Sequence, residues 1–206
     1  MKRIVILLFI LAGVFHFKND IGHFFKSGLF DENGNPRIVL FIQNDCGKPC
    51  NMAREDLNAR GIEYEELDIH LNKQLVKEVG FPRTLPYLIV GKEKVQGYNQ
   101  GKYSSNLAQY FGDLALTSYE ESIYQKHFDN NGDPIIVLYG TAWCGYCKKL
   151  RKAFNEHNMP FLDYDVEKPV KQVELIKTLG ITGYPTVYVG YERVQGFDIK
   201  AVQAAL

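Results

Sequence analysis

IIVLYGTAWCGYCKKL, residues 135–150, joins a continuous apolar run to two cysteines spaced as Cys-x-x-Cys. The apolar run predicts a β-strand that is buried on both faces. From Lys148 to Asn158 the apolar side chains recur at helical spacing, which predicts a helix. Cys144 and Cys147 therefore fall where a buried strand passes into a helix.

The same pattern occurs earlier in the chain, so the sequence contains an internal repeat. Residues 30–41, FDENGNPRIVLF, recur as residues 128–139, FDNNGDPIIVLY. Residues 86–98, PYLIVGKEKVQGY, recur as residues 185–197, PTVYVGYERVQGF. Two such blocks in the same order predict two domains of one architecture.

Each repeat predicts the element order β-α-β-α-β-β-α. After the first strand of each repeat we expect helices at 51–60, 73–79, 103–111, 148–158 and 170–179, strands at 63–69 and 161–166, and a connecting helix at 118–127 that begins with Ser118 and Glu121 at capping-box spacing. Two parallel strands joined through a helix need a right-handed crossover, and the turns at Gly91 and Gly190 imply an antiparallel pair. The fold class is therefore α/β, with a small mixed sheet flanked by helices in each domain.

The first 18 residues differ from the rest. Lys2 and Arg3 precede an apolar run from Ile4 that reaches Phe17, a pattern typical of a signal peptide or a short membrane anchor, although a buried strand or helix remains an alternative. We expect the domains at residues 19–112 and 113–206. By the positive-inside tendency they lie on the periplasmic side of the cell envelope, tethered through residues 4–17 or released after cleavage. Cysteine pairs persist as disulfides in such a compartment.

Charge balance argues against nucleic acid as a partner. The 206 residues carry 24 Lys and Arg against 24 Asp and Glu, and no basic cluster interleaves with aromatic residues. The composition is that of an ordinary globular protein.

The placement of the cysteines predicts redox chemistry. A helix N-terminus stabilises an anion, and this position lowers the pKa of a thiol from about 8.5 into the range of roughly 3.5 to 7.5. We therefore expect Cys144 to be the attacking thiolate and the more shielded Cys147 to resolve the mixed disulfide. A structural bridge is a weaker explanation, because so short a loop constrains the unfolded chain little.

The second repeat resembles the thioredoxin superfamily in four features: a strand, the motif from Trp143 to Cys147, a helix, and a proline before the third strand. The short domains are similar to glutaredoxins. The resemblance implies a thiol–disulfide oxidoreductase in which Pro185, and Pro86 in the first domain, are cis and face the cysteines. It also implies that substrate-binding residues include Trp143, Tyr146, Tyr184, Gly196 and Asp198.

The sequence departs from both branches of that superfamily. Leu138 stands where thioredoxins bury a carboxylate, and Thr141 stands where glutaredoxins place a glutathione-binding lysine. Gln195 and Tyr184 also replace smaller residues of the glutaredoxin pattern. The resemblance thus implies a disulfide-containing protein as substrate, with glutathione as an alternative co-substrate, no other cofactor, and an upstream redox partner.

The first motif, Cys46-Gly47-Lys48-Pro49-Cys50, has three intervening residues. Either Cys46 and Cys50 form a second redox pair, or this domain is a degenerate copy that serves docking, dimerisation or substrate binding, because an extra residue alters the geometry that a disulfide needs.

Two further alternatives stay open. Four cysteines in two pairs could handle zinc or copper, although we expect no metal site because each pair lies in its own domain. His127 and His157 are expected on helix surfaces and support no such site. The protein could also be a binding module of the cell envelope that performs no exchange.

Overall fold

The computed structural model describes residues 29–170 and 172–206. The predicted signal or anchor segment lies outside the described residues. Within the described part of the chain, no helix combines the length and the apolar character that crossing a membrane requires.

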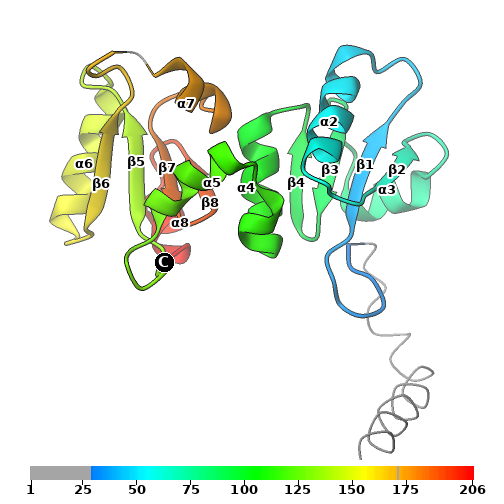
Figure 1. The fold of residues 1–206 in the computed structure, drawn as a ribbon, viewed down its shortest axis with the longest axis horizontal. Helices are drawn as coiled ribbons and strands as arrows, with labels where there is room; N and C mark the ends of the chain where they lie inside the picture. The colour runs from blue at the N-terminus through cyan, green and yellow to red at the C-terminus, as the bar shows by residue number, and fades with distance from the viewer. Residues whose placement is uncertain (1–28, 171) are drawn as a thin grey trace, which may run out of the picture.

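In the described part of the chain, eight strands form two separate four-stranded sheets (Figure 1). The first has the order β2-β1-β3-β4 and consists of β1 (Ile38–Ile42), β2 (Glu65–Asp68), β3 (Tyr87–Val90) and β4 (Glu93–Gln96). The second has the order β6-β5-β7-β8 and consists of β5 (Ile136–Gly140), β6 (Phe161–Asp165), β7 (Thr186–Val189) and β8 (Glu192–Gln195). In each sheet the first two strands of the chain pair in parallel and the other pairs are antiparallel, which confirms the predicted fold.

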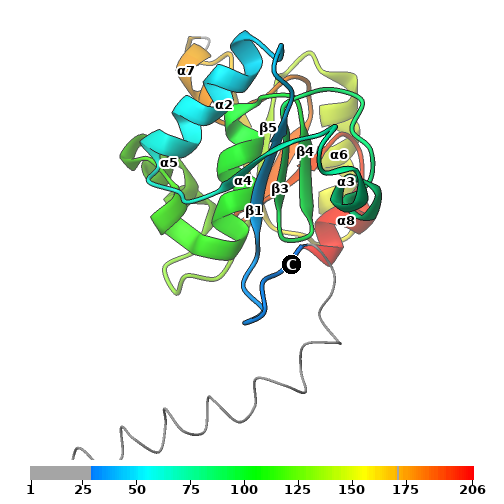
Figure 2. The same ribbon diagram turned by 90° about the vertical axis from the view of Figure 1, so that its right-hand side faces the viewer.

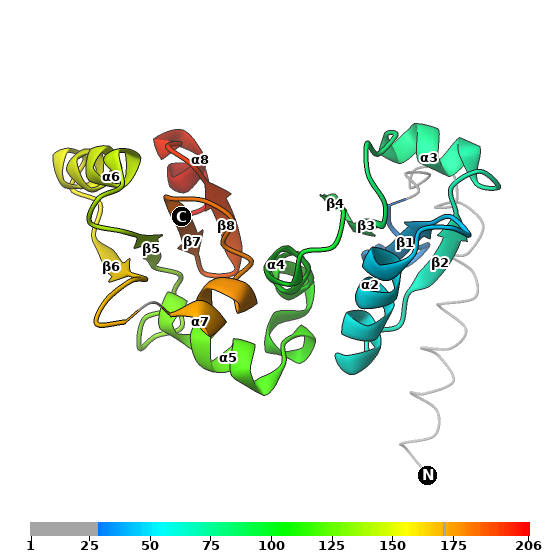
Figure 3. The ribbon, with the colours of Figure 1, turned by 90° about the horizontal axis from the view of Figure 1, so that it is seen from above.

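Helices cover both faces of each sheet (Figure 3). They are α2 (Lys48–Ala59), α3 (Lys73–Val79), α4 (Gln100–Phe111), α5 (Ser118–Tyr124), α6 (Gly145–Glu156), α7 (Val173–Thr178) and α8 (Ile199–Ala204), with 3-10 turns at Gly112–Ala115 and Gln125–His127. Alternate residues of the central strands point to opposite faces. Leu40 thus packs with α2 and α4, whereas Phe41 packs with α3. Leu138 packs with α6 and α8, and Tyr139 packs on the face that α5 and α7 cover.

Several local predictions need correction. The helices after the cysteine motifs begin at Lys48 and Gly145, three residues earlier than predicted, because the residues between the cysteines already form the first turn. The predicted capping box at Ser118 and Glu121 is shifted by one residue. Thr117 is the N-cap, and its hydroxyl and the Glu120 carboxylate exchange hydrogen bonds with each other's backbone N–H.

The prediction that His127 lies on a helix surface is wrong, because its side chain is fully buried and its ring contacts Tyr124 of α5 and Tyr188 of β7. The ring Nδ1 lies 3.0 Å from the carbonyl oxygen of Gly190, and Nε2 lies 2.8 Å from the hydroxyl of Tyr139. Burial lowers the pKa of His127 to about 4, although the bond to Gly190 opposes the shift. His157 is exposed, as predicted.

The two domains meet across α4, which lies between the two sheets and contacts α7 and β8 (Figure 3). Gly101 of α4 packs so closely that a Cβ there would overlap the backbone of Leu179 and Gly180. The Ser105 hydroxyl donates a hydrogen bond to the carbonyl of Tyr191 at 2.6 Å. These backbone contacts fix α4 against the second domain.

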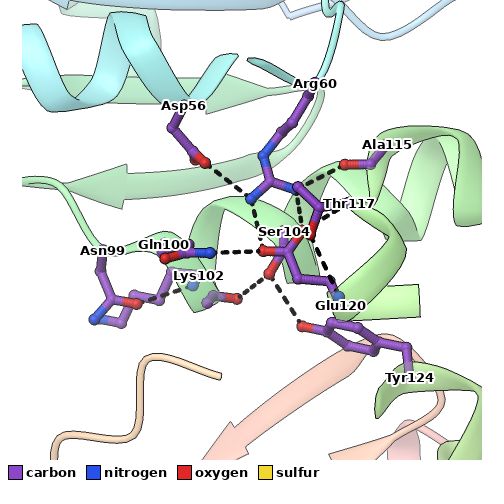
Figure 4. Close-up of polar contacts among 11 residues, drawn as sticks. Asp56, Arg60, Asn99, Gln100, Lys102, Ser104, Ala115, Thr117, Glu120 and Tyr124 are labelled. Carbon is purple, nitrogen blue, oxygen red and sulfur yellow. Dashed lines mark hydrogen bonds and ion pairs between the residues drawn. The ribbon is translucent and has the colours of Figure 1, made fainter. Parts of the chain in front are cut away.

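A buried ion cluster adds to this interface (Figure 4). The Arg60 guanidinium, just after α2, donates to both carboxylate oxygens of Glu120 on α5 at 2.6 and 2.7 Å, and to Asp56 at 3.0 Å. The side chains of Arg60 and Glu120 are both 0% exposed. Burial acts to raise the pKa of Glu120, but the hydrogen bonds and the charge of Arg60 outweigh it and hold that pKa below its usual range. The cluster therefore ties α2 of the first domain to α5 across the interface.

Candidate active site

Cys144 and Cys147 form a disulfide at the start of α6, with their Cα atoms 5.2 Å apart. Cys144 is the N-cap residue, and its sulfur accepts a hydrogen bond from the Cys147 backbone N–H at 3.1 Å. The first residues of a helix leave N–H groups free to stabilise an anion at this position. The geometry thus favours a thiolate on Cys144 once the disulfide is reduced. Cys147 is fully buried and Cys144 is 5% exposed.

The Tyr184–Pro185 peptide bond is cis and directly precedes β7. In the antiparallel pairing of β5 and β7, Thr186 lies opposite Tyr139, so Pro185 stands at the end of the sheet where the cysteine motif follows β5. The carbonyl of Pro185 accepts a hydrogen bond from the Gly196 N–H at 3.0 Å. The sheet therefore brings the Pro185 and Gly196 segments to the same edge as the cysteines.

Exposed aromatic side chains flank the disulfide. Trp143 is 66% exposed and Tyr146 is 62% exposed. The Trp143 indole N–H donates to a carboxylate oxygen of Glu167 at 2.7 Å, and its ring contacts Tyr184 edge to face at 6.1 Å between centroids. We call Trp143, Tyr146 and Tyr184 the aromatic rim. Sequence reasoning did not single out Glu167, because no spacing links the end of β6 to the tryptophan.

The remaining predicted binding residues lie near the start of α8. Asp198 caps this helix, since its carboxylate accepts a hydrogen bond from the Ala201 N–H at 2.9 Å. Gly196 has a φ of 86°, a conformation that favours glycine.

Thr141 is fully buried, and its hydroxyl has no hydrogen-bond partner among the described residues. This side chain is therefore not at the surface, where a glutathione carboxylate would arrive.

The first domain contains the equivalent arrangement. Cys46 and Cys50 form a disulfide with a Cα separation of 5.7 Å, within the usual range, and the Leu85–Pro86 peptide bond is cis. Gly47 takes a φ of 64°, which accommodates the extra residue of this motif before α2 begins. A cavity of about 500 Å³ beside the disulfide is lined by Gln43, Asp45, Cys46, Ile69, His70, Pro82, Arg83, Thr84 and Leu85.

Both disulfides lie at the same end of the molecule. β1 and β5 run in the same direction, with the loops that precede them at the bottom of Figure 1 and the cysteine motifs that follow them at the top. In Figure 2, β1 stands upright and α2 begins above its upper end. Each disulfide stays within its own domain. Among the described residues, no group of three or more His, Cys, Asp or Glu side chains is placed to hold a metal ion.

A small mixed sheet, a Cys-x-x-Cys pair at the start of the helix after its central strand, and a cis-proline at the same edge define the class of thiol–disulfide oxidoreductases with a thioredoxin fold. The family model named Glutaredoxin matches residues 136–194. A glutaredoxin of Pseudomonas aeruginosa is 32% identical over 66 residues, which cover 32% of this chain and 79% of that protein. Within that class the chain therefore belongs to the glutaredoxin family.

The other similar proteins are matched over a smaller share of their length or at lower sequence identity. Protein disulfide-isomerase A4 of Mus musculus is 33% identical over 86 residues, which cover 37% of this chain but only 13% of that protein. Among solved structures, the glutaredoxin of Archaeoglobus fulgidus matches with 18% identity and a TM-score of 0.32, covering 44% of this chain and 94% of that one. The first two thioredoxin domains of Naumovozyma dairenensis Eps1p match with 15% identity and a TM-score of 0.26, covering 82% of this chain and 88% of that one.

Proposed function

We propose that the protein exchanges disulfides with polypeptide substrates through Cys144. The observation that carries this proposal is the aromatic rim, which leaves Trp143 and Tyr146 exposed on either side of a cysteine at a helix N-terminus. Exposed aromatic rings supply apolar contact area for a partner protein. A small thiol alone needs no such surface.

The exchange follows from the positions of the two sulfurs. The Cys144 thiolate attacks one sulfur of a substrate disulfide, and the other substrate sulfur leaves as a thiolate that takes up a proton. The Cys147 thiolate then attacks the Cys144 sulfur, which forms the Cys144–Cys147 bond and releases the second substrate thiol. The substrate gains two electrons and the cysteine pair loses two, and an upstream dithiol partner must restore the reduced pair.

Glutathione is the second candidate substrate, because the chain belongs to the glutaredoxin family. A buckwheat glutaredoxin–glutathione complex is among the similar solved structures, with 20% identity. Against it stand the burial of Thr141 and the use of an Asp198 oxygen to cap α8. We therefore rank a polypeptide disulfide first.

The role of the first domain and the cellular compartment belong to the same proposal. The bonded Cys46 and Cys50 next to a cavity support a second redox pair in the first domain. The basic and apolar pattern of residues 2–17 supports a position on the periplasmic side of the envelope.

Trapping of mixed disulfides tests the proposal in the full chain. Cys147→Ser is expected to accumulate a mixed disulfide with a peptide that contains one internal disulfide, because the resolving thiol is missing. Cys144→Ser is expected to form none at this pair. Cys50→Ser is the equivalent change in the first domain, and it is expected to trap the peptide on Cys46. Mass spectrometry identifies the linked cysteine. A mixed disulfide with glutathione disulfide but none with the peptide would reverse the ranking of substrates.

A redox titration in glutathione buffers provides the independent check. We expect the midpoint potential of the Cys144–Cys147 pair to lie between about −120 and −270 mV, the range in which exchange catalysts fall. A midpoint below about −300 mV would identify a structural bridge and overturn the proposal.

A further inference from the structure

Cys147 occupies an environment that opposes its chemistry. Its side chain is fully buried, and burial in apolar surroundings raises the pKa of a thiol. Leu138, also fully buried, stands on β5 where a carboxylate proton acceptor would lie in a thioredoxin. Release of the substrate nevertheless requires Cys147 as a thiolate, so another group must favour the loss of its proton.

Arg151 lies one helical turn after Cys147 on α6. Its Nε and Nη2 atoms donate to the two carboxylate oxygens of Asp163 on β6 at 2.7 and 3.0 Å. Its Nη1 atom donates to the carbonyl of Thr141 at 3.3 Å. A guanidinium has five N–H donors, so these three bonds leave one on each terminal nitrogen for a further acceptor.

Gly140 leaves the space between this guanidinium and the Cys147 sulfur without a side chain. A Cβ at residue 140 would lie 2.9 Å from the Cys147 sulfur and 3.5 Å from Nη2 of Arg151. Both atoms therefore border the same point in space. Because residue 140 is a glycine, its side chain does not come between the Arg151 guanidinium and the Cys147 sulfur.

The first domain contains the same ion pair without this opening. Arg54 lies one turn after Cys50, and its Nε and Nη2 atoms donate to Glu66 on β2 at 2.7 and 3.1 Å. Glu66 pairs with Leu40 in the same register in which Asp163 pairs with Leu138. In place of Gly140, however, this domain has Ile42, which packs against the core on the α2 face.

The other charged and titratable groups near Cys147 do not supply a comparable cation. Asp163 and Asp165 lie on the part of β6 that pairs with Leu138 and Gly140, and both carry negative charge. Lys148 on α6 is exposed, and Lys168 pairs with Asp165 at 3.6 Å. From the cis-proline segment comes Tyr184, a neutral phenol whose pKa is raised by burial.

We propose that Arg151, held by Asp163, is a positioning residue that stabilises the Cys147 thiolate in the resolving step. The role of this thiolate in releasing the substrate rests on the proposed function, disulfide exchange through Cys144. The Cys147 proton leaves to solvent, the positive charge of Arg151 balances the thiolate, and the thiolate attacks the Cys144 sulfur while the substrate thiolate departs. Arg151 itself neither gains nor loses a proton.

The pKa of Cys147 tests this inference without any substrate. Cysteine Cβ NMR titration of the reduced full chain carrying Cys144→Ser follows the Cys147 thiol, which a Cys147→Ser spectrum identifies. Adding Arg151→Met is expected to raise the pKa of Cys147 by about one unit, a tenfold loss of thiolate at neutral pH, because the nearby positive charge is removed. Arg151→Lys is expected to restore about half of the shift. Arg54→Met, the matched control in the first domain, is expected to leave Cys147 unchanged.

The charge argument also predicts opposite signs for two neighbouring variants. Asp163→Asn keeps an amide oxygen that can still accept a hydrogen bond from Arg151, but it removes the negative charge that partly neutralises the guanidinium. It is therefore expected to lower the pKa of Cys147, whereas Arg151→Met raises it. A merely structural role for the pair predicts shifts of the same sign, and that result would overturn the inference. The same holds if Arg151→Met leaves the Cys147 pKa unchanged in a chain that remains folded by circular dichroism.

The kinetic consequence separates this inference from the proposed function. With Cys144 and Cys147 both present, Arg151→Met is expected to prolong the mixed disulfide with the peptide about tenfold at pH 7, and less at higher pH, while its formation by Cys144 is unchanged. If the natural chain forms no mixed disulfide, the proposed function fails, and the NMR titration still decides the role of Arg151.

Discussion

Replacement of Arg60 by Met is expected to lower the free energy of unfolding by about 3–5 kcal/mol, because it leaves buried carboxylates without their cation. Glu120 is 0% exposed and Asp56 is nearly buried, and the guanidinium hydrogen-bonds to both. Burial raises the pKa of Asp56 even with Arg60 present. Without the arginine the two negative charges oppose each other in a poorly solvated place. Urea unfolding of the full chain measures the loss.

Arg54→Met is the matched control for this prediction. Arg54 forms a similar pair with Glu66, but both side chains are about one third exposed, so the expected loss is below about 1 kcal/mol. The double variant Arg60→Met with Glu120→Gln is expected to recover part of the loss, because it also removes one stranded charge. Equal losses for Arg60→Met and Arg54→Met would contradict the view that the buried cluster ties the domains together.

Gly101→Ala tests the same interface by sterics instead of charge. The new Cβ would collide with the backbone of Leu179 and Gly180, which cannot yield as a flexible side chain does. We expect a loss of about 1–3 kcal/mol, as for overpacked cores, in spite of the higher helix propensity of Ala. Separate unfolding transitions for the two domains would show that α4 couples them in the natural chain. A stability equal to that of the natural chain would count against the tight packing.

The sequence predicts the fold well because the repeat shows each element twice. The continuous apolar run at 135–139 and its counterpart at 38–41 lead to the central strands β5 and β1, and the cysteine motifs follow both strands. A strand that helices cover on both faces is apolar along its whole length, so a continuous apolar run indicates a central strand. The pairing of Cys144 with Cys147 at a helix start follows from the same local pattern.

Contacts between the domains are not visible in the sequence, because the residues that form them lie far apart in the chain and belong to no repeated pattern. Arg60 and Glu120 are 60 residues apart, and no periodic pattern links them. The repeat holds one hint, since His157 and Ala153 of the second domain occupy the places of Arg60 and Asp56. In the structure these charges form a contact with Glu120 that the second repeat has no residues to make. Burial of Arg60 nevertheless needs the three-dimensional arrangement.

Local ambiguities explain the corrected details. Thr117 and Ser118 both stand three residues before a Glu, so the capping-box rule fits either residue, and only the backbone conformation of Thr117 decides. Gly140 and Arg151 were not singled out, because a glycine at a strand end and an arginine on a helix face are ordinary features. Their relation to Cys147 appears only when β5 and α6 are packed together.

The buried His127 makes the stability of the chain depend on pH. The Gly190 carbonyl can only accept a hydrogen bond, so Nδ1 carries the proton and Nε2 accepts from the Tyr139 hydroxyl. The neutral ring is thus satisfied at both nitrogens, whereas a charged ring would face Tyr139 with a second donor inside the core. The pKa of about 4 in the folded chain, against an ordinary value of 6.5, expresses this preference.

As the pH falls from 6.5 towards 4, the unfolded chain binds a proton at His127 that the folded chain refuses, so the free energy of unfolding is expected to fall by about 3 kcal/mol from this group. The contribution is complete above pH 6.5. His127→Gln is expected to flatten this part of the profile, because an amide can serve both partners without titrating here. Carboxylates titrate alike in both chains, so the difference between the urea profiles isolates the histidine. His157→Gln, at an exposed site, is expected to leave the slope unchanged, and an equal change of slope in both variants would show that His127 is not held neutral by burial.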